Sequence, residues 1–156
     1  GANDFLAVDE SGLSFGSVTA FAVMKHDAFE YSTAPWMLGH SGGAWGHTVD
    51  ASNDMYWYDT ASSISSSARS TDQKLFSYTG VSGSQILYVN GSAGTGSGSS
   101  TKTTAFGDSS YNGIGGYYGY FWPYKGIIQE LIVYDSDQTS NRSNIESDID
   151  TAFGIS

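Results

Sequence analysis

Short runs of apolar residues, separated by Gly, Ser and Asn, follow one another along most of this chain. Ser17–Lys25 is apolar at both alternating sets of positions, which is typical of a strand buried on both faces. Gly126–Tyr134 (GIIQELIVY) is the strongest strand signal in the sequence. Lys74–Thr79 and Gln85–Val89 flank the Gly/Ser-rich segment Gly80–Ser84 and therefore predict a β-hairpin.

Two further features extend this β pattern. Asn90-Gly91 follows the second hairpin strand and predicts a tight turn, because both residues tolerate positive φ. Asp54–Asp59 places three consecutive aromatic residues between two carboxylates. The spacing of such runs predicts about nine short strands.

The pattern changes near the C-terminus, where Ser140–Phe153 has the spacing of an amphipathic helix. Ser143 with Glu146 fits a capping box, Ser140 is the alternative N-cap one turn earlier, and Gly154 stands where a C-terminal glycine is expected. The predicted apolar face consists of Ile145, Ile149, Ala152 and Phe153. Short strands followed by one helix predict an all-β, antiparallel sandwich with a short C-terminal α-helix.

Composition narrows the class of protein further. The chain has 156 residues, with 16 acidic and 6 basic side chains, and a net charge of −10. This balance argues against nucleic acid and anionic membrane surfaces as partners, because phosphate groups are bound by clustered basic residues. The sequence has no cysteine for a disulfide or a thiolate metal site, and no apolar run long enough for membrane insertion. Many Tyr and Gly residues with few Lys residues favour an exported β-protein.

Three stretches resemble the concanavalin A-like, laminin-G-like jelly-roll domains. Gly1–Val8 is similar to the opening motif of these domains, and Gln85–Gly91 to their central hairpin. Gly126–Asp135, with the helix after it, is similar to their closing strand and terminal helix, especially in phage structural proteins and aquatic bacterial surface proteins. The resemblance reaches to about Phe153 and implies an antiparallel jelly-roll β-sandwich.

The resemblance departs from the family at the beginning of the chain. In the family an apolar strand precedes the opening motif, whereas this chain begins inside that motif. Residues 1–156 are therefore expected to form a single domain that lacks the usual first strand. A missing strand leaves an edge with unpaired N–H and C=O groups. A preceding segment of a longer chain or a strand donated by another subunit would fill it, and a domain that simply starts late is the remaining alternative.

Catalytic patterns are poorly matched. Related jelly-roll glucanases carry carboxylates at alternate positions of one strand, and the nearest match here is Glu146–Asp150 (ESDID). This segment lies in the predicted helix, where residues i, i+2 and i+4 do not share a face. Gly12–Gly16 fits G-x-S-x-G, but a strand follows it where a nucleophile elbow requires a helix. We therefore expect a protein that is not an enzyme.

A metal cofactor is indicated only by a partial motif. Asp135 and Asp137, with Glu146 further along, partly match a calcium-binding loop, although Thr139 and Ser140 occupy positions where the motif has Asp or Asn and then Gly. Some laminin-G-like domains bind calcium through loop carboxylates, so the resemblance keeps calcium open. No other cofactor is expected.

Two aromatic clusters are candidate glycan-binding surfaces. Aromatic faces stack on the C–H faces of sugar rings, and neighbouring polar groups bind the hydroxyls. Because successive residues of a strand point to opposite faces, part of each cluster is expected in the core or at a subunit interface. The candidates are Trp45, His47, Tyr56 and Trp57 in the first cluster, and Tyr117, Tyr118, Tyr120 and Trp122 in the second.

The sequence also contains two N-x-S sequons, at Asn90 and Asn141, which matter only in a host that glycosylates them. Taken with the aromatic clusters, the pattern predicts a non-catalytic, surface-displayed module for adhesion or carbohydrate recognition in an extracellular or virion-surface protein. The alternative is a structural protein of an extracellular fibre or filament, a phage tail or a shell, assembled by strand addition and aromatic-rich contacts. Expected partners are glycans, other copies of the chain, and neighbouring domains of a longer parent chain.

Overall fold

The structure is a computed structural model that describes residues 6–7, 14–15, 17–27, 33–38, 45–49, 55–59, 62–66, 71–81, 84–94, 104–105, 113–116 and 124–155. Its strands are β1 (Leu6–Ala7), β2 (Ser14–Phe15), β3 (Val18–His26), β4 (Thr33–Leu38), β5 (Trp45–Val49), β6 (Met55–Asp59), β7 (Ser62–Ser66), β8 (Lys74–Val81), β9 (Ser84–Val89), β10 (Ser92–Ala93), β11 (Thr104–Ala105), β12 (Gly113–Ile114) and β13 (Gly126–Tyr134). The described helix is α1 (Arg142–Phe153).

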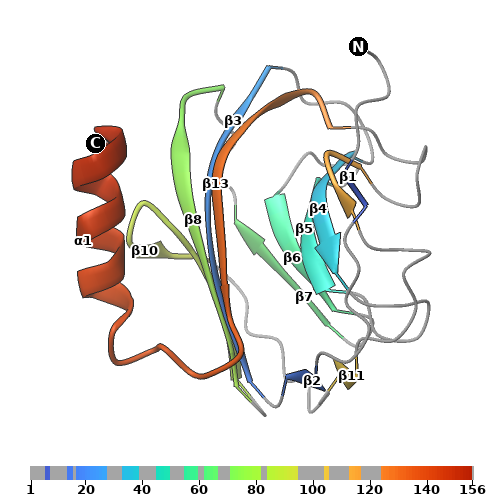
Figure 1. The fold of residues 1–156 in the computed structure, drawn as a ribbon, viewed down its shortest axis with the longest axis vertical. Helices are drawn as coiled ribbons and strands as arrows, with labels where there is room; N and C mark the ends of the chain where they lie inside the picture. The colour runs from blue at the N-terminus through green and yellow to red at the C-terminus, as the bar shows by residue number, and fades with distance from the viewer. Residues whose placement is uncertain are drawn as a thin grey trace.

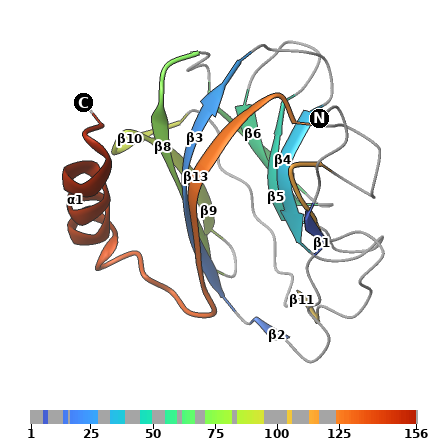
Figure 2. The same cartoon turned by 45° about the horizontal axis from the view of Figure 1, so that its top comes forward.

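Two antiparallel sheets and the helix form three layers (Figures 1 and 2). One sheet has six strands in the order β1-β12-β4-β5-β6-β7, and the other has five in the order β10-β9-β8-β3-β13. A separate short pair joins β11 to β2. α1 covers the face of the five-stranded sheet that is turned away from the six-stranded sheet. The predicted antiparallel β-sandwich with one short C-terminal helix is confirmed.

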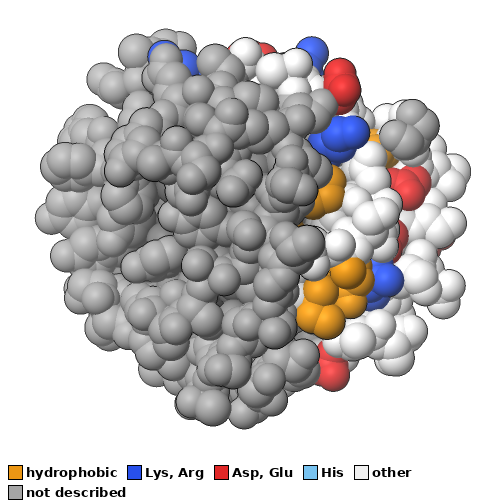
Figure 3. Space-filling view, turned by 180° about the vertical axis from the view of Figure 1, so that it is seen from behind, with side chains coloured by type: hydrophobic (Ala, Val, Ile, Leu, Met, Phe, Trp, Pro, Cys, Tyr) orange, Lys and Arg blue, Asp and Glu red, His pale blue; other side chains and the backbone are white. Residues whose placement is uncertain are grey.

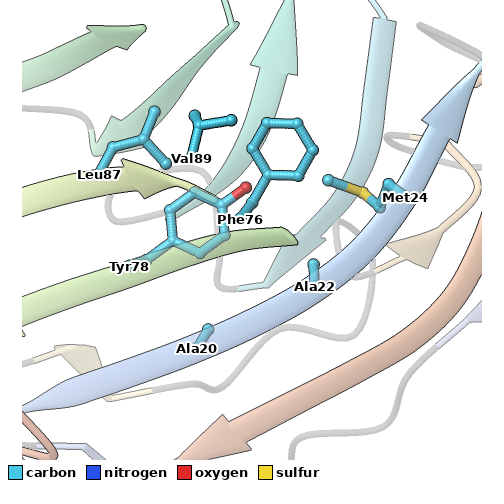
Figure 4. Packing of buried hydrophobic residues seen from close by; sticks show 7 residues of the cluster. All are labelled: Ala20, Ala22, Met24, Phe76, Tyr78, Leu87 and Val89. Carbon is cyan, nitrogen blue, oxygen red and sulfur yellow. The ribbon is translucent and has the colours of Figure 1, made fainter. Parts of the chain in front are cut away.

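β3 lies at the centre of the hydrophobic core, and both of its faces are buried as predicted. Ala20, Ala22 and Met24 join the first core cluster, which faces the six-stranded sheet. Figure 4 shows these side chains on the same side of the sheet as those contributed by β8 and β9. Phe21 and Val23 point to the other face and join the second core cluster, beneath α1. Two-sided burial explains why this strand has no polar alternation.

α1 packs on the sheet through Ile149, which is buried, and through the partly buried Ile145 and Phe153. The prediction that Ala152 belongs to this apolar face is wrong, because Ala152 is exposed. The predicted N-caps are also wrong. The N-cap is Asn141, whose side chain makes no capping hydrogen bond. The predicted glycine at the C-terminus is confirmed, since Gly154 adopts a left-handed conformation with φ of 63° and donates its N–H to the carbonyl of Asp150.

The two predicted hairpin turns are present around β9. β8 and β9 extend further into the Gly/Ser-rich segment than predicted, because Val81 pairs with Ser84. At the other end of β9, Asn90 and Gly91 have φ of 46° and 75° and connect β9 to β10. Both positive φ values fit the tight turn predicted from the Asn-Gly pair.

The described strands at the sheet borders are β1 and β7 in one sheet and β10 and β13 in the other. β1 pairs with β12 through Leu6 and Ala7. These pairings do not test whether an opening strand precedes the chain's first residues, so its absence stays a prediction.

Candidate functional site

Strand register divides the first aromatic cluster between the two faces of the six-stranded sheet. Trp36 pairs with His47, and His47 pairs in turn with Trp57. Ile114 is the partner of Trp36 on the other side, and its side chain packs against the first core cluster. Residues directly opposite one another in a sheet share a face. The positions of His47 and Trp57 therefore belong to the face turned toward the five-stranded sheet, and Trp45, two residues before His47, shares that face.

Tyr56 occupies a position on the opposite, outer face, because it is adjacent to Trp57 in β6. Tyr58 shares the outer face with Tyr56, since the two positions are two residues apart. The register also places small and hydroxyl-bearing residues opposite these two tyrosine positions: Gly46, Thr48, Ser63 and Ser65. The sequence predicted that the aromatic positions of each strand would alternate between the two faces of the sheet. The register now shows which position belongs to which face.

The outer face thus combines two aromatic positions with hydroxyl groups. Two positions two residues apart in a strand are separated by roughly 7 Å. An aromatic platform with neighbouring hydroxyl groups is the combination by which proteins hold sugar rings and orient their hydroxyls. Carboxylates are absent from the outer-face positions of β5, β6 and β7.

The second aromatic cluster, Tyr117, Tyr118, Tyr120 and Trp122, lies outside the described residues. The neighbouring Tyr124 is described and has a structural role. Its hydroxyl donates a hydrogen bond to the carbonyl of Lys25 at 2.8 Å, and its ring packs edge to face on His26 with centres 5.1 Å apart. Burial and the negative charge of Asp27 raise the pKa of Tyr124. Tyr124 therefore connects the start of β13 to the end of β3.

His26 is a buried histidine at the end of β3, whereas the sequence suggested a histidine in or near a loop. It is 1% exposed at the end of β3 and also packs edge to face on Phe76. Burial disfavours the imidazolium and lowers the pKa of His26 from 6.5 to about 4. The ring is consequently neutral at physiological pH and belongs to the packed core.

A polar cluster lies between α1 and the turn after β9. Arg142 forms an ion pair with Glu146 one helical turn later, and its guanidinium lies 3.7 Å from the centre of the Tyr88 ring. Glu146 is 6% exposed. Burial and the charge of Glu146 raise the pKa of Asp150, one further turn along. The cation–π contact attaches the helix to β9, whereas the ion pair lies within the helix and holds the guanidinium of Arg142. No local sequence signal connects Tyr88 to Arg142.

The candidate calcium ligands do not come together. Asp137 accepts a hydrogen bond from the backbone N–H of Thr139 at 2.8 Å, and hydrogen bonding to Thr139 lowers the pKa of Asp137. Glu146 is paired with Arg142 instead, and Asp135 is exposed. Within the described part of the chain, no group of three or more His, Asp or Glu residues is arranged to hold a metal ion. Calcium binding stays a prediction.

The two sequons differ in their surroundings. Asn90 lies in the tight turn, and its side-chain oxygen accepts a hydrogen bond from the backbone N–H of Leu75 at 2.9 Å. Asn141 is exposed at the beginning of α1 and donates a hydrogen bond from its side chain to Gln138. Asn141 is therefore the more accessible of the two for a modifying enzyme.

The two partial catalytic motifs lie in different elements, one in the predicted helix and the other partly in a short strand. Glu146–Asp150 lies in α1, where Glu146 is buried and Asp148 is exposed, so these two carboxylates do not share a face. Ser14 lies within β2, which pairs with β11, and the next described element along the chain is β3. The carboxylate motif requires its carboxylates on one strand face, and a nucleophile elbow requires a helix where β3 is the next described element.

Comparison with known proteins shows the fold. No family model matches the chain, and no curated protein matches it. A candidate carbohydrate-binding protein from Bacteroides ovatus ATCC 8483 has a similar structure, with a TM-score of 0.71 and 19% identity over 88% of this chain and 42% of that chain. Domain 4 of the extracellular GH43 arabinanase AbnA from Geobacillus stearothermophilus, solved with arabinotriose, gives a TM-score of 0.64 and 17% identity over 86% of this chain and 68% of that chain. Trypanosoma rangeli sialidase, solved with sialic acid, gives 0.61 and 18% over 82% of this chain and 22% of that chain.

These likenesses show a β-sandwich fold of the kind found in these three proteins. The chain spans 42% of the Bacteroides protein and 22% of the sialidase, so it corresponds to one part of each. Among the described helical residues, no segment is both long and apolar enough to span a membrane.

Proposed function

We propose that this chain is a non-catalytic glycan-recognition module of the laminin-G-like, concanavalin A-like class. It is displayed outside the cell, on a cell or virion surface, and serves adhesion. The observation that carries the proposal is the outer face of the six-stranded sheet, where the positions of Tyr56 and Tyr58 lie among hydroxyl-bearing residues. The similar structures of a candidate carbohydrate-binding protein and of a domain solved with arabinotriose support it.

Charge selects among possible glycans. The chain has a net charge of −10, and the described surface seen from behind carries acidic side chains among basic ones (Figure 3). Long-range repulsion opposes the approach of sialylated or uronic-acid glycans to such a protein. The ligand expected is therefore a neutral oligosaccharide, held by stacking and by hydrogen bonds to hydroxyl groups.

The experiment is a titration of the purified protein with arabinotriose and with other neutral oligosaccharides by isothermal calorimetry, and with a sialylated oligosaccharide for comparison. Tyr58→Ala and Tyr56→Ala are each expected to weaken binding of a neutral glycan at least tenfold, which is about 1.4 kcal/mol. Their melting temperatures are expected to stay close to that of the parent protein, because both positions belong to the face turned away from the five-stranded sheet.

Trp57→Ala is the matched control in the same strand, since its position lies on the inner face. It should lower the melting temperature instead. If no neutral glycan binds, the proposal fails. If Trp122→Ala abolishes binding while both tyrosine variants bind normally, the site belongs to the second aromatic cluster and the outer face is the wrong surface.

A further inference from the structure

β13 forms one border of the five-stranded sheet. Among the described strands it pairs only with β3 (Figure 2). In an antiparallel sheet, the backbone groups of successive residues alternate between the two neighbours of a strand. Every second residue of β13 therefore directs its N–H and C=O away from β3, and such an edge is a template for a further strand.

Side-chain burial across β3 and β13 indicates where that further strand belongs. Leu131, Ile132 and Val133 are opposite Ala22, Phe21 and Ala20 in β3, respectively. The three β3 residues are 0% exposed, whereas their β13 partners are only partly buried.

This exposure occurs on both faces of the sheet. Leu131 and Val133 pack at the border of the first core cluster, and Ile132 and Tyr134 at the border of the second. Both core layers are consequently open at the same edge. One additional strand beside β13 would cover both at once, provided that it is apolar at both alternating sets of positions.

A β-bulge limits the regular part of this edge. The register of β13 against β3 shifts between Ile128 and Glu130, and pairing is regular from Glu130 to Tyr134. Bulges increase the local twist and hinder pairing with another strand. The usable edge is therefore Glu130–Tyr134, whose sequence is ELIVY.

This segment is complementary to itself. In an antiparallel pair of two such segments centred on Ile132, Ile132 is opposite its own copy and Leu131 is opposite Val133. Glu130 is opposite Tyr134, whose phenol can donate a hydrogen bond to the carboxylate. A register shifted by two residues fits less well, because it would place the carboxylate of Glu130 opposite Ile132, or that of Asp135 opposite Leu131. A shift of one residue would join the helix-covered face of one copy to the inner face of the other.

We propose that β13 pairs with β13 of a second copy of this chain, antiparallel and centred on Ile132, to form a continuous ten-stranded sheet. Ten is twice the five strands of this sheet. The interface is isologous, because each copy uses the same segment. It does not depend on the proposed glycan site, which lies on the outer face of the other sheet.

Charge makes this association weak and dependent on salt. Each copy carries a net charge of −10, so the two copies repel one another at low ionic strength. Added salt screens this repulsion while apolar burial at β13 is retained. Pairing along five residues is also short in comparison with the interfaces of permanent dimers. The dimer is expected at high protein concentration and to strengthen from low to moderate salt.

The test is sedimentation equilibrium of the full chain over a range of protein and salt concentrations. The average mass should rise from 16.6 kDa toward twice that value, and more readily at the higher salt concentration. Ile132→Lys should reduce the association constant at least tenfold, because the two lysines would be opposite one another. Ile145→Lys is the matched control. Ile145 borders the same second core cluster, but it lies on α1, away from the edge.

Amide hydrogen exchange provides a second measurement that needs no variant. In dilute monomer, alternate amides of Glu130–Tyr134 should exchange quickly, and these same amides should become protected as the mass rises. A mass that stays at that of the monomer under all conditions overturns the proposal. Protection of every β13 amide in dilute monomer also overturns it, because the edge would then be covered within one chain. Undiminished dimerisation of Ile132→Lys would place the interface elsewhere.

Discussion

Replacing Ile149 by alanine is expected to lower the free energy of unfolding by about 3 kcal/mol, within the range for large-to-small substitutions in cores. Ile149 is 7% exposed and packs with Phe21, Val23 and Leu75, which are 0% exposed. These neighbours come from β3 and β8, two interior strands of the five-stranded sheet, which cannot move into the cavity without breaking their ladder. The cavity therefore stays largely open, and movement of the neighbouring side chains does not reduce the loss of unfolding free energy.

Ile149→Asp should be more damaging, at more than about 4 kcal/mol, because it adds the cost of placing a carboxylate in apolar packing. For a chain of this length, 1 kcal/mol corresponds to roughly 2–4 °C in melting temperature. The alanine variant is therefore expected to melt roughly 6–12 °C below the parent protein. Asp148→Ala is the control, because Asp148 is exposed on the same helix and its loss should change stability by less than about 0.5 kcal/mol.

The assay is urea unfolding followed by far-UV and near-UV circular dichroism, together with thermal melting. Coincident transitions would show that helix and sheets unfold together. A shift for Ile149→Ala as small as that of Asp148→Ala would refute the reasoning, because it would mean that α1 contributes little to the stability of the sandwich. An early loss of the helical signal with an unchanged sheet transition would also refute it, since only the helix would then be released.

The remaining predictions concern the end of β3 and the glycines. Gly126→Ala should destabilise the protein by more than about 2 kcal/mol, because a β-carbon there would lie 2.2 Å from the carbonyl oxygen of Lys25 and 2.6 Å from the hydroxyl of Tyr124. At Gly154 a β-carbon would meet nothing within 4 Å, so Gly154→Ala should lower the free energy of unfolding only by the roughly 1–2 kcal/mol of a left-handed backbone. Equal losses of unfolding free energy for the two glycine variants in urea would contradict this prediction. Folding lowers the pKa of His26 from 6.5 to about 4. Between these two pH values the unfolded chain binds more protons than the folded chain, so the free energy of unfolding falls as the pH decreases. His26 should contribute about 2 kcal/mol to the difference in unfolding free energy between pH 7 and pH 5, and an unchanged pH dependence in His26→Leu would refute this.

The sequence predicted the elements well where a residue's role is set by its immediate neighbours. Gly126–Tyr134 is a strand with the predicted bounds, and the Asn90-Gly91 turn is present because both residues tolerate positive φ. Helix capping was predicted less well. The motif at Ser143 and Glu146 matched a capping box, yet Glu146 pairs with Arg142 and the helix begins after Asn141. A tertiary contact with Tyr88 holds Arg142 in place, and the spacing of residues along the helix does not predict this contact.

The candidate site shows the same division. Residue types identified aromatic positions that suit sugars, and alternation along β6 predicted that they would divide between two faces. Which face is which followed only from the register that joins Trp57, His47, Trp36 and Ile114 across four strands. The candidate calcium ligands illustrate the same point, since Asp137 accepts a hydrogen bond from Thr139 and Glu146 forms an ion pair with Arg142, and neither contact is evident from the motif.

By itself, the sequence determined the class of fold, the two-sided burial of β3, the tight turn after β9 and the amphipathic terminal helix, because each depends on periodicity or on the conformational range of single residues. Only the tertiary structure decided the order of strands, the inner and outer faces of the six-stranded sheet, and the position of β13 at a border with both core layers partly exposed. Strand order depends on pairings between residues far apart in the chain. Those pairings are selected by the packing of whole sheets, and local sequence constrains them only weakly.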